Sequence, residues 1–225
     1  MRQDIASTPI PRLDELNSIV NRSADRDNAP QLEQRIMLTL YYAPGSSSFA
    51  THIALHEVGA TFETHRLSIP DKGTHTPEYL AINPAGKVPA LAIDGRILTE
   101  VAATLFYLAK TYPDAGLFPP DTNIEAQAQV LSWMSFVASG LHPVWNKGLD
   151  LALPAFEIAD KRLGDSEWAA DTYSIADIHL FRLYWRLSGV NDLAPGSFPN
   201  LKRHHDQMLQ RPAVIRTIEA ETSGT

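Results

Sequence analysis

The sequence of 225 residues predicts a small α/β domain with a mixed sheet, followed by an all-helical domain. Between Met37 and Tyr112, short apolar runs typical of strands alternate with longer runs of helical period. A proline-rich stretch, "YPDAGLFPPDTN", follows them and is typical of a linker. Beyond it, no run of residues has the pattern of a strand. We therefore predict an α/β domain at residues 37–112, a linker at 113–123 and a helical domain at 124–225.

Each element of the first domain has its own signal. Four runs are typical of strands, namely residues 37–42, 61–68, 88–93 and 96–100. The last two form a hairpin, because Asp94-Gly95 between them is a strong signal for a tight turn. One helix is predicted from the serine-rich turn to Gly59, and a second from Thr99 to just before Pro113. The segment between the second and third strands contains proline and glycine and is predicted to be a loop.

The second domain shows only helical patterns. The predicted helices are residues 124–142, 153–164, 174–190 and 200–210, with a short final helix after Pro212. Ser174, with Asp177 three residues further on, forms a capping box ahead of an apolar run. The first domain, with its order β-α-β, loop, β-β-α, therefore carries the mixed sheet, and the second is a bundle of helices.

The first 36 residues differ in composition from the rest. They contain three prolines and mixed charges, and they contain no aromatic residue. Such a segment buries too little apolar surface to offset the entropy of ordering, so we predict a disordered N-terminal extension at residues 1–36. Met37 opens the first strand, and translation could equally begin there.

The composition argues against several classes of function. A formal net charge of -7 and the lack of any basic cluster argue against a nucleic-acid or anionic-membrane partner. The apolar runs are too short to cross a bilayer and the N-terminus lacks a secretory pattern, so a cytoplasmic protein is expected. The absence of cysteine excludes disulfides, thiolate metal sites and a cysteine nucleophile. His52 and His56 lie four residues apart without an evident third ligand, so no metal is expected.

Three consecutive serines, Ser46, Ser47 and Ser48, follow a Pro-Gly pair between the first strand and the first helix. A serine in this place can cap the helix, act as a nucleophile, or hold a reactive atom through a hydrogen bond. No G-x-S-x-G elbow is present, which argues against a Ser-His-Asp hydrolase. A helix cap and a hydroxyl that holds a reactive atom of a ligand are the readings that remain.

Four motifs occur in one order along the chain. They are the serine turn in "YYAPGSSSFATHIALHE" (41–57), "NPAGKVPAL" (83–91), "LTE" (98–100) and the capping box at Ser174 and Asp177. Together they resemble the glutathione S-transferase superfamily, from Met37 nearly to the C-terminus. The bacterial beta class is the most similar, on the serine turn and on "SGLHP" (139–143). The resemblance implies a thioredoxin-like N-terminal domain with a mixed four-stranded sheet, and an all-α C-terminal helical domain.

The resemblance also implies a binding site for glutathione. The Val88-Pro89 bond matches the cis-proline of the family, where the backbone at Val88 pairs with the cysteinyl part of glutathione. Glu100 matches the residue that accepts the γ-glutamyl ammonium. The next residue is Val101, where the family usually has serine, so only a backbone N–H remains there for the carboxylate and weaker binding is expected. Three more residues match positions near the peptide, although each could instead be structural or solvated: Tyr42, Lys72 and Lys87.

Two serines are candidates for holding the sulfur of glutathione. Ser47 replaces the beta-class cysteine, whereas Ser46 takes the hydroxyl role when the chain is aligned on Pro-Gly with the serine-type classes. His142 matches a beta-class histidine that leans over the sulfur, although a lone histidine before Pro143 can also be structural. We favour Ser47, with Ser46 as its rival.

The function implied by the resemblance is transfer of the glutathione thiolate to an apolar electrophile, in a homodimeric detoxification enzyme without a metal. The segment between His142 and Trp168 is shorter than the beta-class pattern, which leaves the electrophile wall and the dimer contact open. The alternative is a non-catalytic glutathione-binding or protein-interaction member of the same fold, because a fold does not determine activity. A glutathione-dependent disulfide reductase that uses its own cysteine is excluded by the composition.

Overall fold

The computed structural model describes residues 36–190 and 193–223. The extension predicted at residues 1–36 therefore lies outside the described residues, apart from Ile36. The strands are β1 (Leu38–Tyr42), β2 (Phe62–Arg66), β3 (Ala90–Ile93) and β4 (Arg96–Thr99). The helices beside them are α2 (Ser48–Glu57), α3 (Pro77–Ile82) and α4 (Val101–Thr111), with 3-10 turns at Gly73–His75 and Pro113–Ala115.

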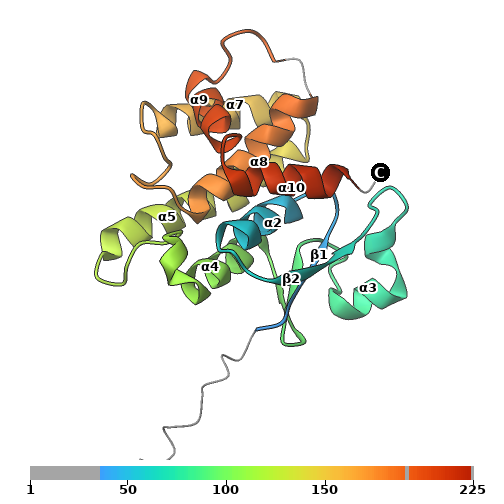
Figure 1. Cartoon of the computed structure of the whole chain (residues 1–225). Coiled ribbons are helices and arrows are strands. Elements are labelled where there is room, and N and C mark those ends of the chain that lie inside the picture. The colour runs from blue at the N-terminus through green and yellow to red at the C-terminus, as the bar shows by residue number, and fades with distance from the viewer. Residues whose placement is uncertain (1–35, 191–192, 224–225) are drawn as a thin grey trace, which may run out of the picture. The chain divides into compact units, whose positions relative to one another are not determined.

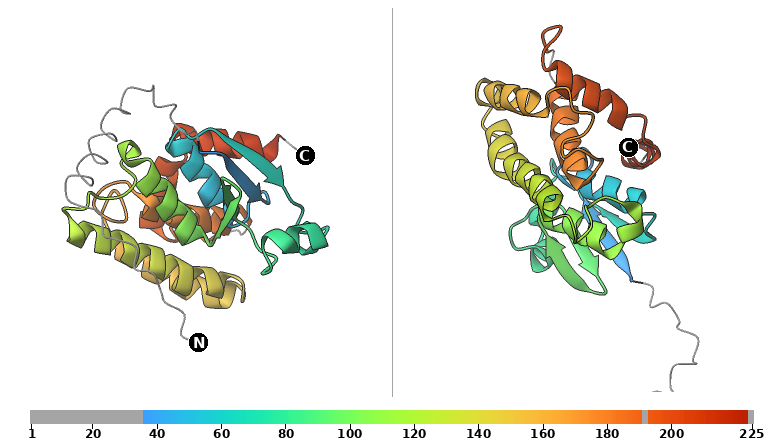
Figure 2. Two further views of the ribbon diagram at one scale, coloured as in Figure 1. Left: turned by 90° about the horizontal axis from the view of Figure 1, so that it is seen from below. Right: turned by 90° about the vertical axis from the view of Figure 1, so that its left-hand side faces the viewer.

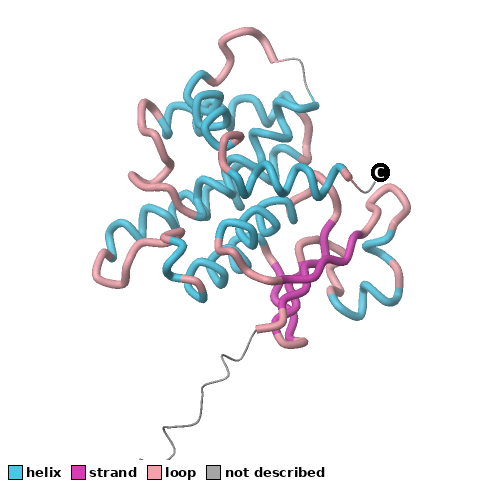
Figure 3. Tube along the Cα trace, viewed as in Figure 1, coloured by secondary structure: helices cyan, strands magenta, loops and turns pink. Residues whose placement is uncertain are grey.

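The four strands form one mixed sheet in the order β2-β1-β3-β4 (Figure 3). β1 runs parallel to β2 and antiparallel to β3, so that Leu40 pairs with Thr64 on one side and Leu91 on the other. β3 and β4 are antiparallel and are joined at Asp94-Gly95. Both turn residues have positive φ, 48° and 81°, as a type I′ hairpin turn requires. The predicted hairpin is confirmed.

The alternation of side chains along β1 separates two apolar layers. Leu38, Leu40 and Tyr42 are buried in the main core, which they share with α2 and α4. Tyr41 points to the opposite face, where it packs against Tyr79 of α3. In Figures 1 and 2 the helices α2 and α4 accordingly lie on one side of the sheet and α3 on the other. This alternation is the period of two that half-buried strands require.

The prediction that the whole segment between β2 and β3 is a loop was wrong, because α3 lies in it. This helix has six residues, too few to show a helical period in the sequence. Its start is nevertheless well formed, since the Thr76 hydroxyl accepts a hydrogen bond from the Tyr79 amide and Pro77 occupies the first turn. The second predicted helix, α4, begins at Val101 rather than at Thr99, which still belongs to β4.

Beyond the linker, the described residues form helices without a further β-strand ladder. They are α5 (Ile124–Phe136), a π-helical turn (Val137–Leu141), α6 (His142–Trp145), α7 (Leu149–Leu163), α8 (Ile175–Val190), α9 (Pro199–Met208) and α10 (Pro212–Thr222). α8 packs against α2, α4, α5 and α9, and most of its apolar side chains are buried. α10 packs against α2 (Figure 1). The main core thus runs without interruption from the sheet into the helices.

The N-terminus of α8 confirms the predicted capping box. Asp177 Oδ2 accepts hydrogen bonds from the Ser174 amide at 2.9 Å and the Ser174 hydroxyl at 3.2 Å. Its other oxygen, Oδ1, accepts from the Ala169 amide at 2.7 Å and from His204 Nε2 at 2.9 Å. The buried carboxylate therefore joins α8 to α9 and to the segment before α8, beyond its local role as a cap.

Candidate functional site

A cavity of about 330 Å³ lies between the N-terminal α/β part and the helices. Its walls come from the start of α2, the loop before β3, the junction of β4 with α4, the π-helical turn, α6 and α8. The lining residues are Ser47, Asn83, Lys87, Val88, Pro89, Thr99, Glu100, Val101, Ala102, Ala138, His142, Pro143, Asn146 and His179. Most of the residues that the sequence singled out thus share one cavity.

The structure separates the three serines of the turn. Ser46 and Ser48 are buried, with their hydroxyl oxygens 2.8 Å apart. Ser48 Oγ bonds to both the amide and the carbonyl of Ala43, and the Ser48 amide donates to Ser46 Oγ at 3.3 Å. Ser47 makes no capping bond; its hydroxyl donates to the Val88 carbonyl at 2.5 Å. Of the three, only Ser47 lines the cavity.

The serine turn is held in place by the C-terminal helices. The Gly45 amide donates to Glu221 Oε2 of α10 at 2.8 Å, and Arg186 of α8 donates to the Gly45 carbonyl at 2.5 Å. The other carboxylate oxygen of Glu221 lies 2.9 Å from His52 Nδ1 on α2. Sequence reasoning missed these contacts, because Gly45 and Glu221 are 176 residues apart and no local pattern relates them.

The loop before β3 presents its backbone to the cavity. The Val88-Pro89 peptide bond is cis, as expected. The Lys87 carbonyl accepts from the Tyr79 hydroxyl at 2.6 Å and from Asn83 Nδ2 at 2.7 Å. These two bonds turn the Lys87 carbonyl toward α3. Asn83 was noted only as part of a motif, and the structure gives it a structural contact as well as a place on the cavity wall.

Glu100 occupies the residue before the first turn of α4 in an unusual backbone conformation. Its φ is 70°, a value that non-glycine residues adopt rarely and that tends to occur at functional sites. Its side chain is exposed and makes no capping bond to the helix, so its carboxylate is available to a ligand. Val101 follows at the N-terminus of α4, where backbone N–H groups favour anions.

The opposite wall carries two neutral histidines. His142 lies where the π-helical turn meets α6, and His179 lies on α8. Burial, and then the positive charges of Arg182, Lys87 and Arg186, lower the pKa of His142 to about 4. Burial, followed by Arg182 and His142, also lowers the pKa of His179 well below its ordinary value. Sequence reasoning missed His179, although a histidine in an otherwise apolar helical run was a signal that could have been weighed.

Three predicted residues do not reach this cavity. Tyr42 is buried in the main core, with its ring 5.3 Å from that of His52, and burial raises its pKa. Lys72 is exposed, with a left-handed backbone (φ 58°) beside the 3-10 turn. The Ser46 hydroxyl points into the serine turn, where it bonds to the Ser48 hydroxyl. These three residues do not line the cavity, whereas Ser47 does, and the roles of all four in binding stay predictions.

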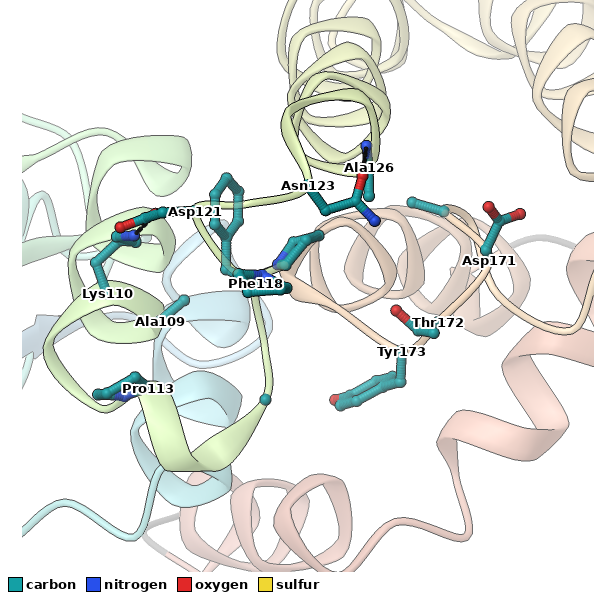
Figure 4. Close-up of a pocket in the computed structure, with 14 residues that line it drawn as sticks. Ala109, Lys110, Pro113, Phe118, Asp121, Asn123, Ala126, Asp171, Thr172 and Tyr173 are labelled. Atoms are coloured by element: carbon teal, nitrogen blue, oxygen red, sulfur yellow. Dashed lines mark hydrogen bonds and ion pairs between the residues drawn. The ribbon is translucent and has the colours of Figure 1, made fainter.

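A larger cavity, of about 560 Å³, lies between the end of α4, the linker and the segment before α8 (Figure 4). Several of its polar groups already have partners: Lys110 pairs with Asp121, and the Asn123 side chain accepts from the Ala126 amide. The Tyr173 hydroxyl donates to Glu57 at 2.8 Å. Among the described residues, no buried side-chain atom without a hydrogen bond lines this cavity. We therefore place the candidate site in the smaller cavity.

Neither a cluster of metal-binding side chains nor a helix that could cross a membrane is found among the described residues. No cluster of three or more histidines and acidic side chains has the arrangement of a metal site. His52 bonds to Glu221, and burial lowers the pKa of His56 to about 4. No helix in residues 36–190 or 193–223 combines the length and apolar character needed to cross a bilayer.

The mixed sheet with its cis-proline loop, followed by a bundle of helices, is a thioredoxin-like domain joined to an all-helical domain, so the predicted fold class is confirmed. Family models of the glutathione S-transferase N-terminal and C-terminal domains match residues 37–110 and 143–212. Glutathione S-transferase GST-4.5 of Xanthomonas campestris pv. campestris is 40% identical over 207 residues, which cover 82% of this chain and 98% of that protein. The chain therefore belongs to the glutathione S-transferase family, as its motifs predicted.

Among the other relatives, one has the name of an isomerase and one was solved with glutathione bound. The probable maleylacetoacetate isomerase of Caenorhabditis elegans is 30% identical over 195 residues, covering 77% of this chain and 89% of that protein. A sphingomonad glutathione S-transferase, solved in complex with glutathione, matches with a TM-score of 0.73 and 31% identity, over 81% of this chain and 98% of that one. The bacterial beta-class enzyme of Sphingomonas chungbukensis matches with a TM-score of 0.70 and 34% identity, over 82% and 98% of the two chains.

Proposed function

We propose that this protein is a glutathione transferase, in which Ser47 stabilises the glutathione thiolate for attack on a small electrophile. The observation that carries the proposal is the placement of the serines: Ser46 and Ser48 bond within the turn, whereas Ser47 lines the same cavity as His142. Membership of the family and the glutathione complex of the sphingomonad relative support glutathione as the co-substrate.

In the proposed complex, glutathione lies along the wall of the N-terminal part. The Glu100 carboxylate takes the γ-glutamyl ammonium, and the start of α4 at Val101 takes the neighbouring carboxylate. The backbone of Val88 pairs with the cysteinyl part of the peptide. Because the cysteinyl N–H would then donate to the Val88 carbonyl, the Ser47 hydroxyl is released from that carbonyl and can donate to the sulfur.

The proposed role of the protein is to lower the pKa of the glutathione thiol and to hold the two reactants together. A thiol with a reference pKa near 8.5 is only a few per cent ionised at neutral pH, so lowering that pKa increases the fraction of nucleophile directly. The thiol proton goes to solvent, the sulfur forms a bond to the electrophile, and the electrophile gives up its leaving group or accepts the electron pair. The cavity contributes proximity by holding both reactants.

The wall that would receive the electrophile is of mixed polarity. The expected apolar surface is represented by Ala138 and Pro143, and the polar side chains of Asn146 and His179 lie beside it. We therefore propose a compact electrophile with an apolar body and one hydrogen-bonding group. The homodimer expected of the family remains part of the proposal, and the molar mass in solution would test it.

The test compares Ser47→Ala with Ser46→Ala. Ser47→Ala should still bind glutathione, because Glu100 and the Val88 backbone remain. The bound thiol should titrate at higher pH, measured by thiolate absorbance in the ultraviolet, and turnover of a generic aromatic halide at neutral pH should fall with it. Ser46→Ala should instead lower the Tm by about 2–4 °C, since it removes the buried hydrogen bonds of Ser46 Oγ to Ser48 and a lost hydrogen bond costs about 1 kcal/mol. Its thiol titration should match that of the wild type.

Two results would contradict the assignment. If Ser46→Ala shifts the thiol titration and Ser47→Ala does not, Ser46 holds the sulfur. If neither variant shifts it, His142 or a backbone N–H is the next candidate. Tight glutathione binding by the wild type without turnover of any electrophile would favour the non-catalytic alternative.

A further inference from the structure

Arg182, on α8, is buried, and its charge has no ion-pair partner within residues 36–190 and 193–223. Its side chain is 1% exposed, and its Nε and Nη2 atoms have no hydrogen-bond acceptor. An unpaired buried charge destabilises a folded protein, and the usual remedy is an adjacent carboxylate. Among the described residues, no carboxylate forms an ion pair with Arg182. Burial, and then the positive charge of Arg186, lower the pKa of Arg182 to about 9. The guanidinium is therefore still charged at neutral pH.

The position of Arg182 relates this charge to the candidate site. His179 lies three residues before Arg182, and residues at this spacing lie on the same face of a helix. His179 lines the cavity, is 1% exposed, and has an unpartnered Nδ1. After burial, Arg182 is also the largest cause of the lowered pKa of both His179 and His142, the two histidines of that wall. The buried charge thus lies on the same face of α8 as His179, a residue of the cavity wall.

The remaining charges around the cavity do not neutralise Arg182. The charged and titratable residues at or behind its walls are Lys87, Glu100, His142, His179, Arg182 and Arg186. Arg186 donates to the Gly45 carbonyl, and Glu100 lies on the wall of the N-terminal part. Three charged or titratable groups on the other helices packed against α8 have partners elsewhere: Glu57 pairs with Arg211, Lys110 with Asp121, and His204 with Asp177. The field of Arg182 therefore acts on the cavity.

We propose that Arg182 is the buried counter-charge of the glutathione thiolate, acting through the wall formed by His142 and His179. This inference rests on the proposed function and deepens it. Ser47 supplies a hydrogen bond to the sulfur, and Arg182 supplies the positive charge that both histidines, being neutral, cannot supply. Ionisation releases the thiol proton to solvent and leaves the negative charge on the sulfur within the field of the guanidinium. Such a field is stronger in a buried site than in water.

The experiment titrates the thiol of bound glutathione in the wild type and in three Arg182 variants. Arg182→Met and Arg182→Gln remove the charge. The pH at which the bound thiol titrates should then rise by about one unit, which is a tenfold loss of thiolate at neutral pH. Arg182→Lys keeps the positive charge, so the bound thiol should titrate close to the pH at which it titrates in the wild type. The affinity for the serine analogue of glutathione, which has a hydroxyl in place of the thiol, should stay within about twofold of the wild type in every variant. Arg162→Met removes an exposed arginine of α7 that does not line the cavity, and its titration should be unchanged.

A second readout separates this role from a structural one. Because Arg182 is buried without a counter-ion, Arg182→Met should keep or raise the Tm while it raises the thiol titration. An arginine that only supports the packing would show a lower Tm and an unchanged titration. If Arg182→Met does not fold, Arg182→Gln retains the polar shape and gives the same test.

The proposal is overturned if glutathione bound to the Met or Gln variant titrates as in the wild type, or if Arg182→Lys behaves like Arg182→Met. Those outcomes leave the proposed function intact. The two failures are distinguishable, since failure of the wild type to bind glutathione, or titration of its bound thiol at the pH of free glutathione, overturns both proposals.

Discussion

Glu221, near the C-terminus, should be essential to the serine turn at the other end of the described chain. It is 5% exposed, and its two oxygens accept from the Gly45 amide at 2.8 Å and bond to His52 Nδ1 at 2.9 Å. Glu221→Ala removes both contacts and leaves a buried amide and a buried imidazole unsatisfied. The perturbation therefore acts on α10, α2 and the turn together.

The expected size of the effect follows from these two contacts. A hydrogen bond to a charged group contributes about 1.5–3 kcal/mol, so two of them in a buried site should cost about 3 kcal/mol or more. In a domain of this size, each kcal/mol corresponds to about 2–4 °C in Tm, which predicts a fall of about 6–12 °C. Because Gly45 is next to Ser46 and two residues from Ser47, glutathione-dependent turnover should fall as well, even at temperatures where the variant is folded.

Thermal unfolding followed by circular dichroism, and turnover measured well below the Tm, provide the assay. Glu219→Ala is the matched control, since it removes the same charge from the same helix at an exposed position. Surface changes of this kind usually stay within about 0.5 kcal/mol, so the control should shift the Tm by about 2 °C at most. Equal Tm values for the two variants would refute the argument that α10 holds the serine turn.

Two further predictions concern the binding of glutathione by Glu100 and the stability of the protein in acid. Glu100→Gln should weaken glutathione binding by about 30- to 150-fold, or about 2–3 kcal/mol, with little change in Tm, because the carboxylate is exposed and does not cap α4. Calorimetric titration checks this, and an unchanged affinity would leave Glu100 without a role in binding. The pKa of His56 and that of His142 are each lowered, chiefly by burial, from 6.5 to about 4, so the unfolded chain takes up more protons than the folded one between those pH values. Stability present above pH 6.5 should therefore be lost as the pH falls toward 4. The Tm of His56→Gln should fall less over this pH range than the Tm of the wild type. Equal falls in Tm would contradict the role of His56 in acid stability.

The sequence by itself predicted the features that depend on short stretches of chain. The strand pattern of residues 37–42, the hairpin at Asp94-Gly95 and the cap formed by Ser174 and Asp177 all follow from residues close in sequence. Each depends on local backbone geometry or on a repeating pattern of burial, so each is visible without the fold. The order of the motifs then indicated the family, and with it half of the residues that line the cavity.

Only the tertiary structure decided between residues that are equivalent in sequence. Ser46, Ser47 and Ser48 are adjacent and chemically identical, and what distinguishes them is the direction in which the start of α2 turns each hydroxyl. The helix α3 was missed because six residues are too few to establish a helical period. Arg182 looked like an ordinary residue of a helical run, yet the packing of α2, α4, α5 and α9 around α8 leaves it buried and without a partner. Burial and pairing depend on which distant segments meet, as Gly45 meets Glu221 across 176 residues, and the spacing of residues along the chain does not carry that information.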